Sequence, residues 1–213
     1  MPAPLPRLDT LLDAADQALR TVFAKPSANR QNPAAQHAAE SDQTEQDKVT
    51  SAALMRVNHA GEVAAQALYQ GQQLFARSPR VRDRLAESAS EEQDHLAWCA
   101  QRLQELDARP SRLNPLWYLG AYSIGTVAGL AGDRVSLGFV AETEKQVVQH
   151  LRDHLARLPE SDTRSQAILE QMALDEADHG QAALLEGGLP PPPPVRRLMG
   201  LAGQIIRQVA YRV

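Results

Sequence analysis

Apolar residues recur at helical spacing along most of the chain, and the breaks between these stretches are short. The pattern predicts an amphipathic helix over residues 8–23 and long helices over 48–77, 79–108, 133–158 and 162–186. Proline or glycine falls at the helix ends, as at Ser78-Pro79, Pro159 and Gly187-Gly188. Because short breaks make consecutive helices antiparallel neighbours, we expect an all-α bundle of four long helices. One longer crossover joins the second helix to the third.

The segments outside the four long helices differ in character. Residues 1–47 join the amphipathic helix to a polar, proline-containing stretch, which we interpret as a loop or flexible connector. Residues 113–132 carry no charge over a length borderline for crossing a bilayer, although Pro115 and several glycines interrupt them. Residues 189–213 begin with prolines 190–194, a stiff spacer, and continue as a basic amphipathic helix. The bundle itself is assigned to residues 48–188.

Composition and charge restrict the classes of protein to which this chain can belong. A chain of 213 residues is long enough to bury one contiguous core. The net charge of −4, with both signs interspersed, gives no electrostatic footprint for nucleic acid, which we do not expect as a partner. The single cysteine, Cys99, lies in an apolar helical stretch and is predicted to be a small buried hydrophobe. The N-terminus lacks the basic head and apolar run of a secretory signal.

One arrangement of glutamate and histidine occurs twice. Glu62 precedes Glu92-Gln93-Asp94-His95, and Glu144 precedes Glu176-Ala177-Asp178-His179. A Glu and a His three residues apart lie about 60° apart around a helix and can bind the same ion. One Glu from each of two helices, with Glu-x-x-His from each of the other two, is the ligand set of ferritin-like di-iron and di-manganese proteins. The sequence therefore predicts a ferritin-like four-helix bundle with the metal ligands Glu62, Glu92, His95, Glu144, Glu176 and His179.

Helical periodicity supports this choice of glutamates. Glu144 lies on the apolar stripe of its helix, whereas Glu142 points about 160° away. Glu92 shares its face with leucines, while Glu91 is turned about 100° from that face. Glu62 has the weakest pattern, because polar residues share its face. Two divalent cations would compensate the four carboxylates, which are costly to bury without a partner.

The ligand chemistry favours iron or manganese over zinc, because carboxylates outnumber imidazoles and no thiolate is included. Iron can also change its oxidation state. The hypothesis is a centre of two Fe(II) ions that reacts with O2, with one histidine on each ion. In it, Glu92 and Glu176 bridge the ions, and Glu62 and Glu144 are terminal ligands.

Three further residues are expected beside this centre. Asp175 either orients a ligand histidine on a facing helix or is a solvated surface residue. His150 lies about 120° from the direction of Glu144, which places it beside the cavity or at the surface rather than on the metal. Tyr69 is either a hydrogen-bond donor at the edge of the cavity or an ordinary packing residue, and packing is favoured.

The chain resembles the Coq7 (demethoxyubiquinone hydroxylase) family from about Arg56 to its C-terminus. The resemblance rests on RVNHAGEVAAQALYQGQ, EEQDHLAWC, NPLWYLGAYSIGTVAGLAG, the segment from Glu144 to His150, and DEADHG, with shifted spacing around the paired glutamates of the third helix. It implies that the six predicted ligands hold two iron ions. It also implies an O2-dependent monooxygenase that hydroxylates a polyprenyl-methoxy-methyl-benzoquinone in ubiquinone biosynthesis, with electrons from NADH. The chain has no Gly-x-Gly-x-x-Gly that would mark a nicotinamide site, so the electrons arrive through the quinone itself or through a partner.

Two surfaces suggest contact with lipid. The uncharged segment 113–132 carries Trp117, Tyr118 and Tyr122, which suit a membrane interface, and the C-terminal helix combines arginines with leucines and isoleucines, which suits anionic lipid. We therefore expect a peripheral membrane protein at the cytoplasmic face of a bacterial cell membrane. In the alternative, both segments pack on the bundle or form a homo-oligomer interface. Other proteins of quinone biosynthesis are also possible partners.

Two other functions are compatible with the same ligands. A soluble ferritin-like protein that oxidises or stores iron, or that detoxifies peroxide, would use the same six side chains. The uncharged, aromatic-flanked segment favours the hydroxylase, because an iron store needs a cage interface rather than lipid contact. A lipid or quinone carrier with a structural metal is the third alternative.

Overall fold

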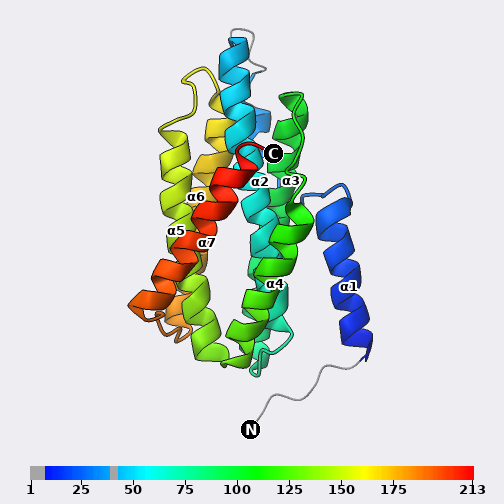
Figure 1. The fold of residues 1–213 in the computed structure, drawn as a ribbon, viewed down its shortest axis with the longest axis vertical. Coiled ribbons are helices and arrows are strands. Elements are labelled where there is room, and N and C mark those ends of the chain that lie inside the picture. Colours follow the sequence, from blue (N-terminus) through cyan, green and yellow to red (C-terminus); the bar gives the residue numbers. More distant parts are fainter. Residues whose placement is uncertain (1–7, 39–42) are drawn as a thin grey trace.

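The computed structural model describes residues 8–38 and 43–213, and within these ranges it contains helices and no strand. The helices are α1 (Leu8–Phe23), the 3-10 helix η1 (Pro33–Gln36), α2 (Glu45–Gln73), α3 (Pro79–Glu105), α4 (Asn114–Leu130), α5 (Asp133–Leu155), α6 (Thr163–Leu185) and α7 (Pro193–Ala210). Helices α2, α3, α5 and α6 form the bundle, α4 and α7 lie over one side of it, and α1 packs beside α2 and α4 (Figure 1). The predicted all-α, ferritin-like architecture is confirmed.

The helix ends have local causes. α2 begins at Glu45, within the predicted connector, because Thr44 and Asp47 form a capping box: Thr44 Oγ1 accepts from the Asp47 amide at 3.1 Å, and the Asp47 carboxylate accepts from the Thr44 amide at 3.2 Å. Pro79 opens α3, where its missing N–H costs nothing. Asp162 caps α6 by accepting from the Ser165 amide at 2.9 Å. The other predicted boundaries lie within a few residues of those observed.

Helix α4, formed by the uncharged segment between α3 and α5, packs closely along α2. A Cβ at Gly71 or Gly125 would overlap with the backbone of the opposite helix, so glycine at these positions allows the two helices to approach. The outward face of α4 remains apolar, with Leu116, Leu119 and Val127 each more than half exposed. Within residues 8–38 and 43–213, no helix combines the length and apolar character needed to cross a bilayer.

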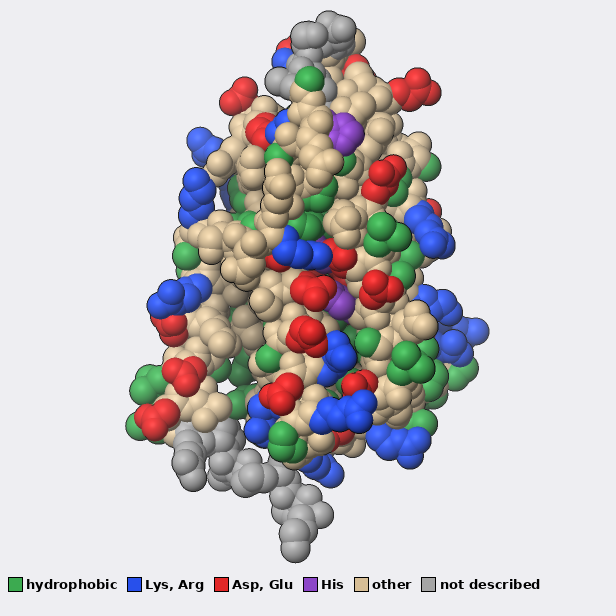
Figure 2. All heavy atoms as spheres, turned by 180° about the vertical axis from the view of Figure 1, so that it is seen from behind, with side chains coloured by type: hydrophobic (Ala, Val, Ile, Leu, Met, Phe, Trp, Pro, Cys, Tyr) green, Lys and Arg blue, Asp and Glu red, His purple; other side chains and the backbone are tan. Residues whose placement is uncertain are grey.

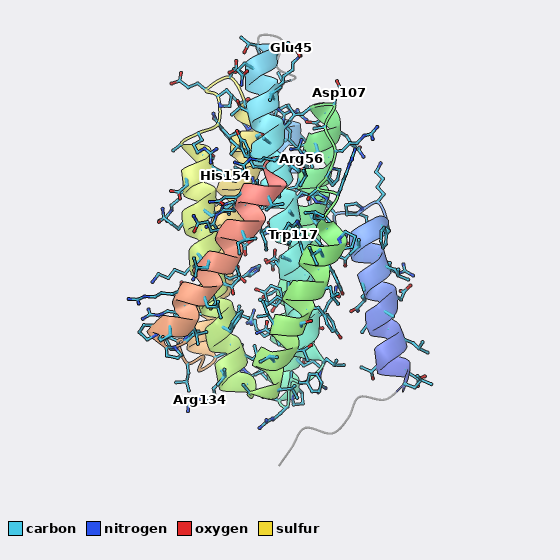
Figure 3. All side chains as sticks on the ribbon, viewed as in Figure 1. Glu45, Arg56, Asp107, Trp117, Arg134 and His154 are labelled. Atoms are coloured by element: carbon cyan, nitrogen blue, oxygen red, sulfur yellow. The ribbon has the colours of Figure 1, made fainter. Side chains whose placement is uncertain are left out.

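Helix α7 crosses over α2 and α5 and is fixed at its C-terminal end. Arg56 of α2 donates to the Tyr211 carbonyl at 3.2 Å, and Ala210 is fully buried against α2. Figure 3 shows Arg56 and Trp117 beside this end of α7. Prolines 190–194 were predicted to form a spacer, and that prediction is wrong for Pro193 and Pro194. These two occupy the first turn of α7, because proline's fixed φ suits that position.

The polar segment after α1 is docked on the bundle where it is described. Ala34 of η1 is fully buried and packs into the core with Trp98 and Leu169. Arg164 of α6 donates to the His37 carbonyl at 2.7 Å. Residues 1–7 and 39–42, which belong to the predicted N-terminal region 1–47, lie outside the described residues.

Two apolar clusters flank the middle of the bundle. One contains Leu54, Trp98, Leu103, Leu151 and Leu169, and Cys99 is fully buried in it as predicted. The other contains Tyr69, Val81, Leu85, Leu137 and Val140. The predicted ligand positions lie between these clusters on every bundle helix, so rigid packing on both sides holds them. The outer face in Figure 2 carries acidic and basic side chains interspersed.

Candidate metal centre

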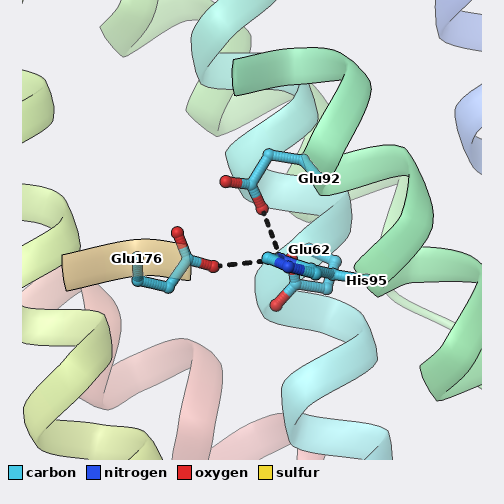
Figure 4. A group of neighbouring side chains, drawn as sticks. All are labelled: Glu62, Glu92, His95 and Glu176. Carbon is cyan, nitrogen blue, oxygen red and sulfur yellow. Dashed lines mark ion pairs between the residues drawn. The ribbon is translucent and has the colours of Figure 1, made fainter. Parts of the chain in front are cut away.

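The bundle brings all six predicted ligands into its interior. Glu62 comes from α2, Glu92 and His95 from α3, Glu144 from α5, and Glu176 and His179 from α6. None of the six is more than 8% exposed. Ligand atoms of Glu62, Glu92, His95 and Glu176 lie within 4.8 Å of one another (Figure 4). The polar face of α2, where periodicity was weakest, therefore points into the bundle at Glu62.

His95 defines one half of the centre. Its Nδ1 points inward and lies 3.2 Å from Glu176 Oε1, 3.5 Å from Glu92 Oε2 and 3.7 Å from Glu62 Oε2. Figure 4 shows the Glu92 and Glu176 carboxylates directed at this nitrogen. One imidazole nitrogen and three carboxylates thus converge on a common volume, which is a ligand set of the kind that iron and manganese accept.

His179 defines the other half. Its Nδ1 lies 3.1 Å from Glu176 Oε2 and 3.3 Å from Glu92 Oε1. Glu92 and Glu176 therefore each direct one oxygen toward His95 and the other toward His179. Each of these two glutamates thus contacts both histidines through different oxygens.

Glu144 lies beside the His179 half. It is 1% exposed, and its Oε1 accepts a hydrogen bond from Tyr69 Oη at 2.7 Å. Tyr69 is itself fully buried in an apolar cluster. The two interpretations of Tyr69 are thus both met, because it packs in the core and donates to a predicted ligand.

The outward nitrogen of each histidine faces a carboxylate on the opposite helix. His95 Nε2 lies 2.9 Å from Asp175 Oδ2, and His179 Nε2 lies 2.9 Å from Glu91 Oε2. Such contacts fix the tautomer and the ring orientation of ligand histidines. Asp175 is placed as one of its two interpretations expected. Glu91 was overlooked, although the sequence carries a signal: both acids immediately precede the glutamate of a Glu-x-x-His motif.

The pKa values of the centre are shifted because several carboxylates are buried close together, away from water. Burial and the Glu92 carboxylate raise the pKa of Glu62 well above its usual value, and burial together with Glu176 raises the pKa of Glu144 in the same direction. Burial disfavours the cationic form of His179, but the Glu176 and Glu92 carboxylates beside it raise its pKa to about 12. The cluster therefore retains protons unless another source of positive charge is supplied.

The residues present fit a metal centre. Among the buried side-chain atoms without a hydrogen-bond partner, Glu62 Oε2, both oxygens of Glu92 and His95 Nδ1 lie together in the ligand cluster, whereas the others are scattered through the fold. Buried polar atoms are rarely left unpaired, and a bound cation would satisfy these four. The donors are oxygen and imidazole nitrogen, which suit iron or manganese, and no thiolate lies among them.

His150 is not part of the ligand cluster. Its Nε2 lies 3.0 Å from Asn58 Oδ1, and the same oxygen lies 2.9 Å from His154 Nδ1. Burial lowers the pKa of His154 to about 4 and lowers that of His150 well below its usual value. His150 also borders an apolar cavity.

That cavity has a volume of about 270 Å³ and lies between α2, α4, α5 and α7. Its lining is almost entirely apolar and includes Gly61, Leu68, Ile124, Phe139, Val147 and Leu198. Gly61 and Thr143, which also line it, immediately precede Glu62 and Glu144 in the sequence. None of the six predicted ligands lines the cavity, which borders the residues that precede two of them and lies on the side of the bundle covered by α4 and α7.

Comparison with known proteins agrees with this arrangement. The model of the ubiquinone biosynthesis protein COQ7 family matches residues 49–210. The chain belongs to the COQ7 family. A 3-demethoxyubiquinol 3-hydroxylase of Cupriavidus metallidurans is 55% identical over 97% of this chain and 100% of its own length. Proteins of the same name from Ralstonia pickettii and Variovorax paradoxus are each 54% identical, over 97% of this chain and 100% and 98% of their own lengths. The resemblance of the motifs to the Coq7 family is thereby confirmed.

Proposed function

We propose that this COQ7-family chain is a di-iron monooxygenase that hydroxylates a demethoxyubiquinol, the substrate in the name of its relatives. The observation that carries the proposal is the division of the Glu92 and Glu176 oxygens between His95 and His179. The residues that would hold the two irons are Glu62, Glu92, His95, Glu144, Glu176 and His179.

The reaction replaces an aromatic C–H bond of the quinol with C–OH. One oxygen atom of O2 enters the product, and the other leaves as water with two protons and two electrons from a donor. When bound, the irons supply the activation of O2. The chain excludes water from the site by burying all six ligands, while Asp175 and Glu91 orient the imidazoles and Tyr69 holds Glu144 by its Oε1.

The apolar cavity supports a substrate with a polyprenyl tail. Its lining includes the residues that precede Glu62 and Glu144 and residues of α4 and α7, two helices that lie on the same face of the bundle in Figure 1. The outward surfaces of these helices expose Leu119, Val127, Leu198 and Leu201, and α7 adds arginines. Such a surface suits the interface of an anionic membrane, where a polyprenyl quinol resides.

A peripheral position at the cytoplasmic face of the membrane is part of the same proposal. NADH as the electron donor rests on the family resemblance, and we infer that its electrons reach the centre through the quinone or a protein partner. A homo-oligomer and partners in quinone biosynthesis also stay predictions.

The test uses the full chain loaded with Fe(II), a short-chain demethoxyubiquinol and 18O2. We expect a hydroxylated product that carries one labelled oxygen, and we expect Glu176→Ala to abolish its formation. The matched control is Glu170→Ala, which removes an exposed acid from the same helix and should leave turnover unchanged. Iron mineral formation without quinol turnover would instead support the ferritin-like alternative. Quinol binding that survives without any hydroxylation would support the carrier.

A further inference from the structure

The N-terminal segment 24–38, defined here as the N-terminal strap, precedes the part of the chain that the family model matches. It reaches the metal centre through one side chain. Arg30 Nη2 donates to Asp175 Oδ2 at 2.8 Å, and its Nε donates to Asp94 Oδ2 at 2.9 Å. The guanidinium also lies 4.9 Å from the centroid of the Trp98 ring. Arg30 thus ties α3 to α6 directly outside His95.

Asp175 is held by donors on three sides. Its Oδ2 accepts from Arg30 and faces His95 Nε2 at 2.9 Å, while its Oδ1 accepts from Gln171 Nε2 at 2.9 Å. A carboxylate fixed in this way has one orientation in which to meet the imidazole. Arg30 Nη2 also lies 3.3 Å from His95 Nε2, but the contact of that nitrogen with Asp175 is shorter, at 2.9 Å. In the neutral ring, Nε2–H therefore donates to Asp175, and the lone pair of Nδ1 faces the Glu62, Glu92 and Glu176 carboxylates.

The opposite half of the centre lacks this arrangement. Glu91 faces His179 as Asp175 faces His95, but no Lys or Arg within residues 8–38 and 43–213 forms an ion pair with Glu91. Asp94 is buried and accepts from the strap, whereas Asp178, at the same place in the second motif, is exposed. The two motifs repeat in sequence, so the strap makes the two halves unequal.

We propose that Arg30 is a positioning residue for the His95 half of the centre and acts through Asp175. This inference rests on the proposed function, because it requires a metal at His95. Without Arg30, Asp175 loses its charged donor and can rotate away from His95, so Nδ1 is no longer aimed into the cluster. Partners of this kind outside the ligands typically change metal affinity about 10–100-fold.

Whether metal binding weakens or tightens when Arg30 is removed distinguishes a positioning role from a purely electrostatic one. Arg30 is a cation close to a cation site, so its charge alone repels the metal. Its removal would then tighten metal binding. Loss of orientation has the opposite effect and weakens binding at the His95 half.

The experiment titrates the metal-free full chain with Co(II) and follows the visible d–d absorption bands. We expect Arg30→Gln to weaken one Co(II) site about tenfold or more and to change its band shape, with the other site unaltered. Asp175→Asn should do the same. In the Asp175→Asn background, Arg30→Gln should have no further effect, because Arg30 acts through that carboxylate.

Arg164→Gln is the matched control. It removes the hydrogen bond to the His37 carbonyl of the same strap and the ion pair with Glu105, both away from the centre, and should lower thermal stability without changing Co(II) affinity. Unchanged or tighter binding in Arg30→Gln, or additive effects in the double variant, would overturn the proposal for Arg30. A wild-type chain that binds no Co(II) with carboxylate and imidazole ligands would instead overturn the metal centre itself.

Discussion

Tyr69 of α2 and Glu144 of α5 are joined by a hydrogen bond of 2.7 Å inside the bundle, and neither side chain is more than 1% exposed. Tyr69→Phe leaves the buried carboxyl without this donor, so we expect the metal-free protein to lose about 1–2 kcal/mol of unfolding free energy in urea. Metal binding at the His179 half should weaken as well. Tyr122→Phe removes a hydroxyl from a half-buried ring on α4 and is the control. Equal stability of the two variants would show that the Tyr69 bond does not position Glu144.

The cavity can be filled without disturbing the bundle at Gly61. A Cβ at this residue meets nothing within 4 Å, and glycine in a helix costs about 0.5–1 kcal/mol relative to alanine. We therefore expect Gly61→Leu to fold with equal or greater stability and to lower kcat/KM for a long-tailed quinol about tenfold or more, because the side chain occupies the cavity.

Gly120→Leu supplies the comparison for Gly61→Leu. Gly120 is an exposed helical glycine with the same free space at its Cβ, but it lies outside the cavity lining. Turnover of the quinol by this variant should match that of the wild type. If Gly61→Leu also turned over the long-tailed quinol normally, the cavity would not be the route of the tail.

The sequence predicted the bundle and the ligand cluster because both follow from positions along single helices. Glu144 stands on an apolar stripe, and His95 follows Glu92 at the spacing that one ion needs. Contacts between helices depend on their relative register, which local periodicity does not specify. For that reason the periodicity showed only that Glu91 points away from the face that carries Glu92. It did not show that Glu91 reaches His179 on α6. The pairing of His150 and His154 with Asn58 escaped prediction for the same reason.

The N-terminal strap shows a different limit. Its sequence is polar and contains prolines, which is typical of a loop, and nothing in that pattern places Ala34 in the core or Arg30 on Asp175. Segments with little regular structure can dock through a few specific contacts that composition does not reveal.

The proposed membrane association assigns lipid contact to the outward face of α7. Leu201 is 57% exposed there, next to arginines 196 and 197. Leu201→Glu should weaken binding to vesicles of anionic phospholipid about tenfold or more, since burying one leucine contributes about 1.5–3 kcal/mol. Leu185→Glu, at a leucine at the end of α6 that is 79% exposed, should bind as the wild type does in vesicle sedimentation. Equal loss in both variants would contradict a specific lipid-binding role for α7.

His154 makes stability depend on pH. Burial, with Arg157 and Arg207 nearby, lowers its pKa to about 4, so the folded protein holds the neutral ring while the unfolded chain protonates near pH 6.5. The stability that this shift gives the folded protein is therefore fully present above about pH 6.5. It is lost as the pH falls toward 4, because the unfolded chain then binds a proton that the folded protein does not. Between pH 7 and 5, metal-free His154→Leu should lose about 1–2 kcal/mol less unfolding free energy than the wild type. Parallel urea titrations test this, and identical pH slopes would contradict it.

The central claim is that six side chains from four helices hold a pair of irons. Anaerobic titration of the metal-free full chain with 57Fe(II), followed by Mössbauer spectroscopy and metal analysis, tests it most directly. We predict two bound ions per chain in sites of oxygen and nitrogen ligands, and one ion or fewer in Glu176→Ala, because Glu176 faces both histidines. Binding of a single iron per chain by the wild type, or binding that Glu176→Ala leaves intact, would contradict the account.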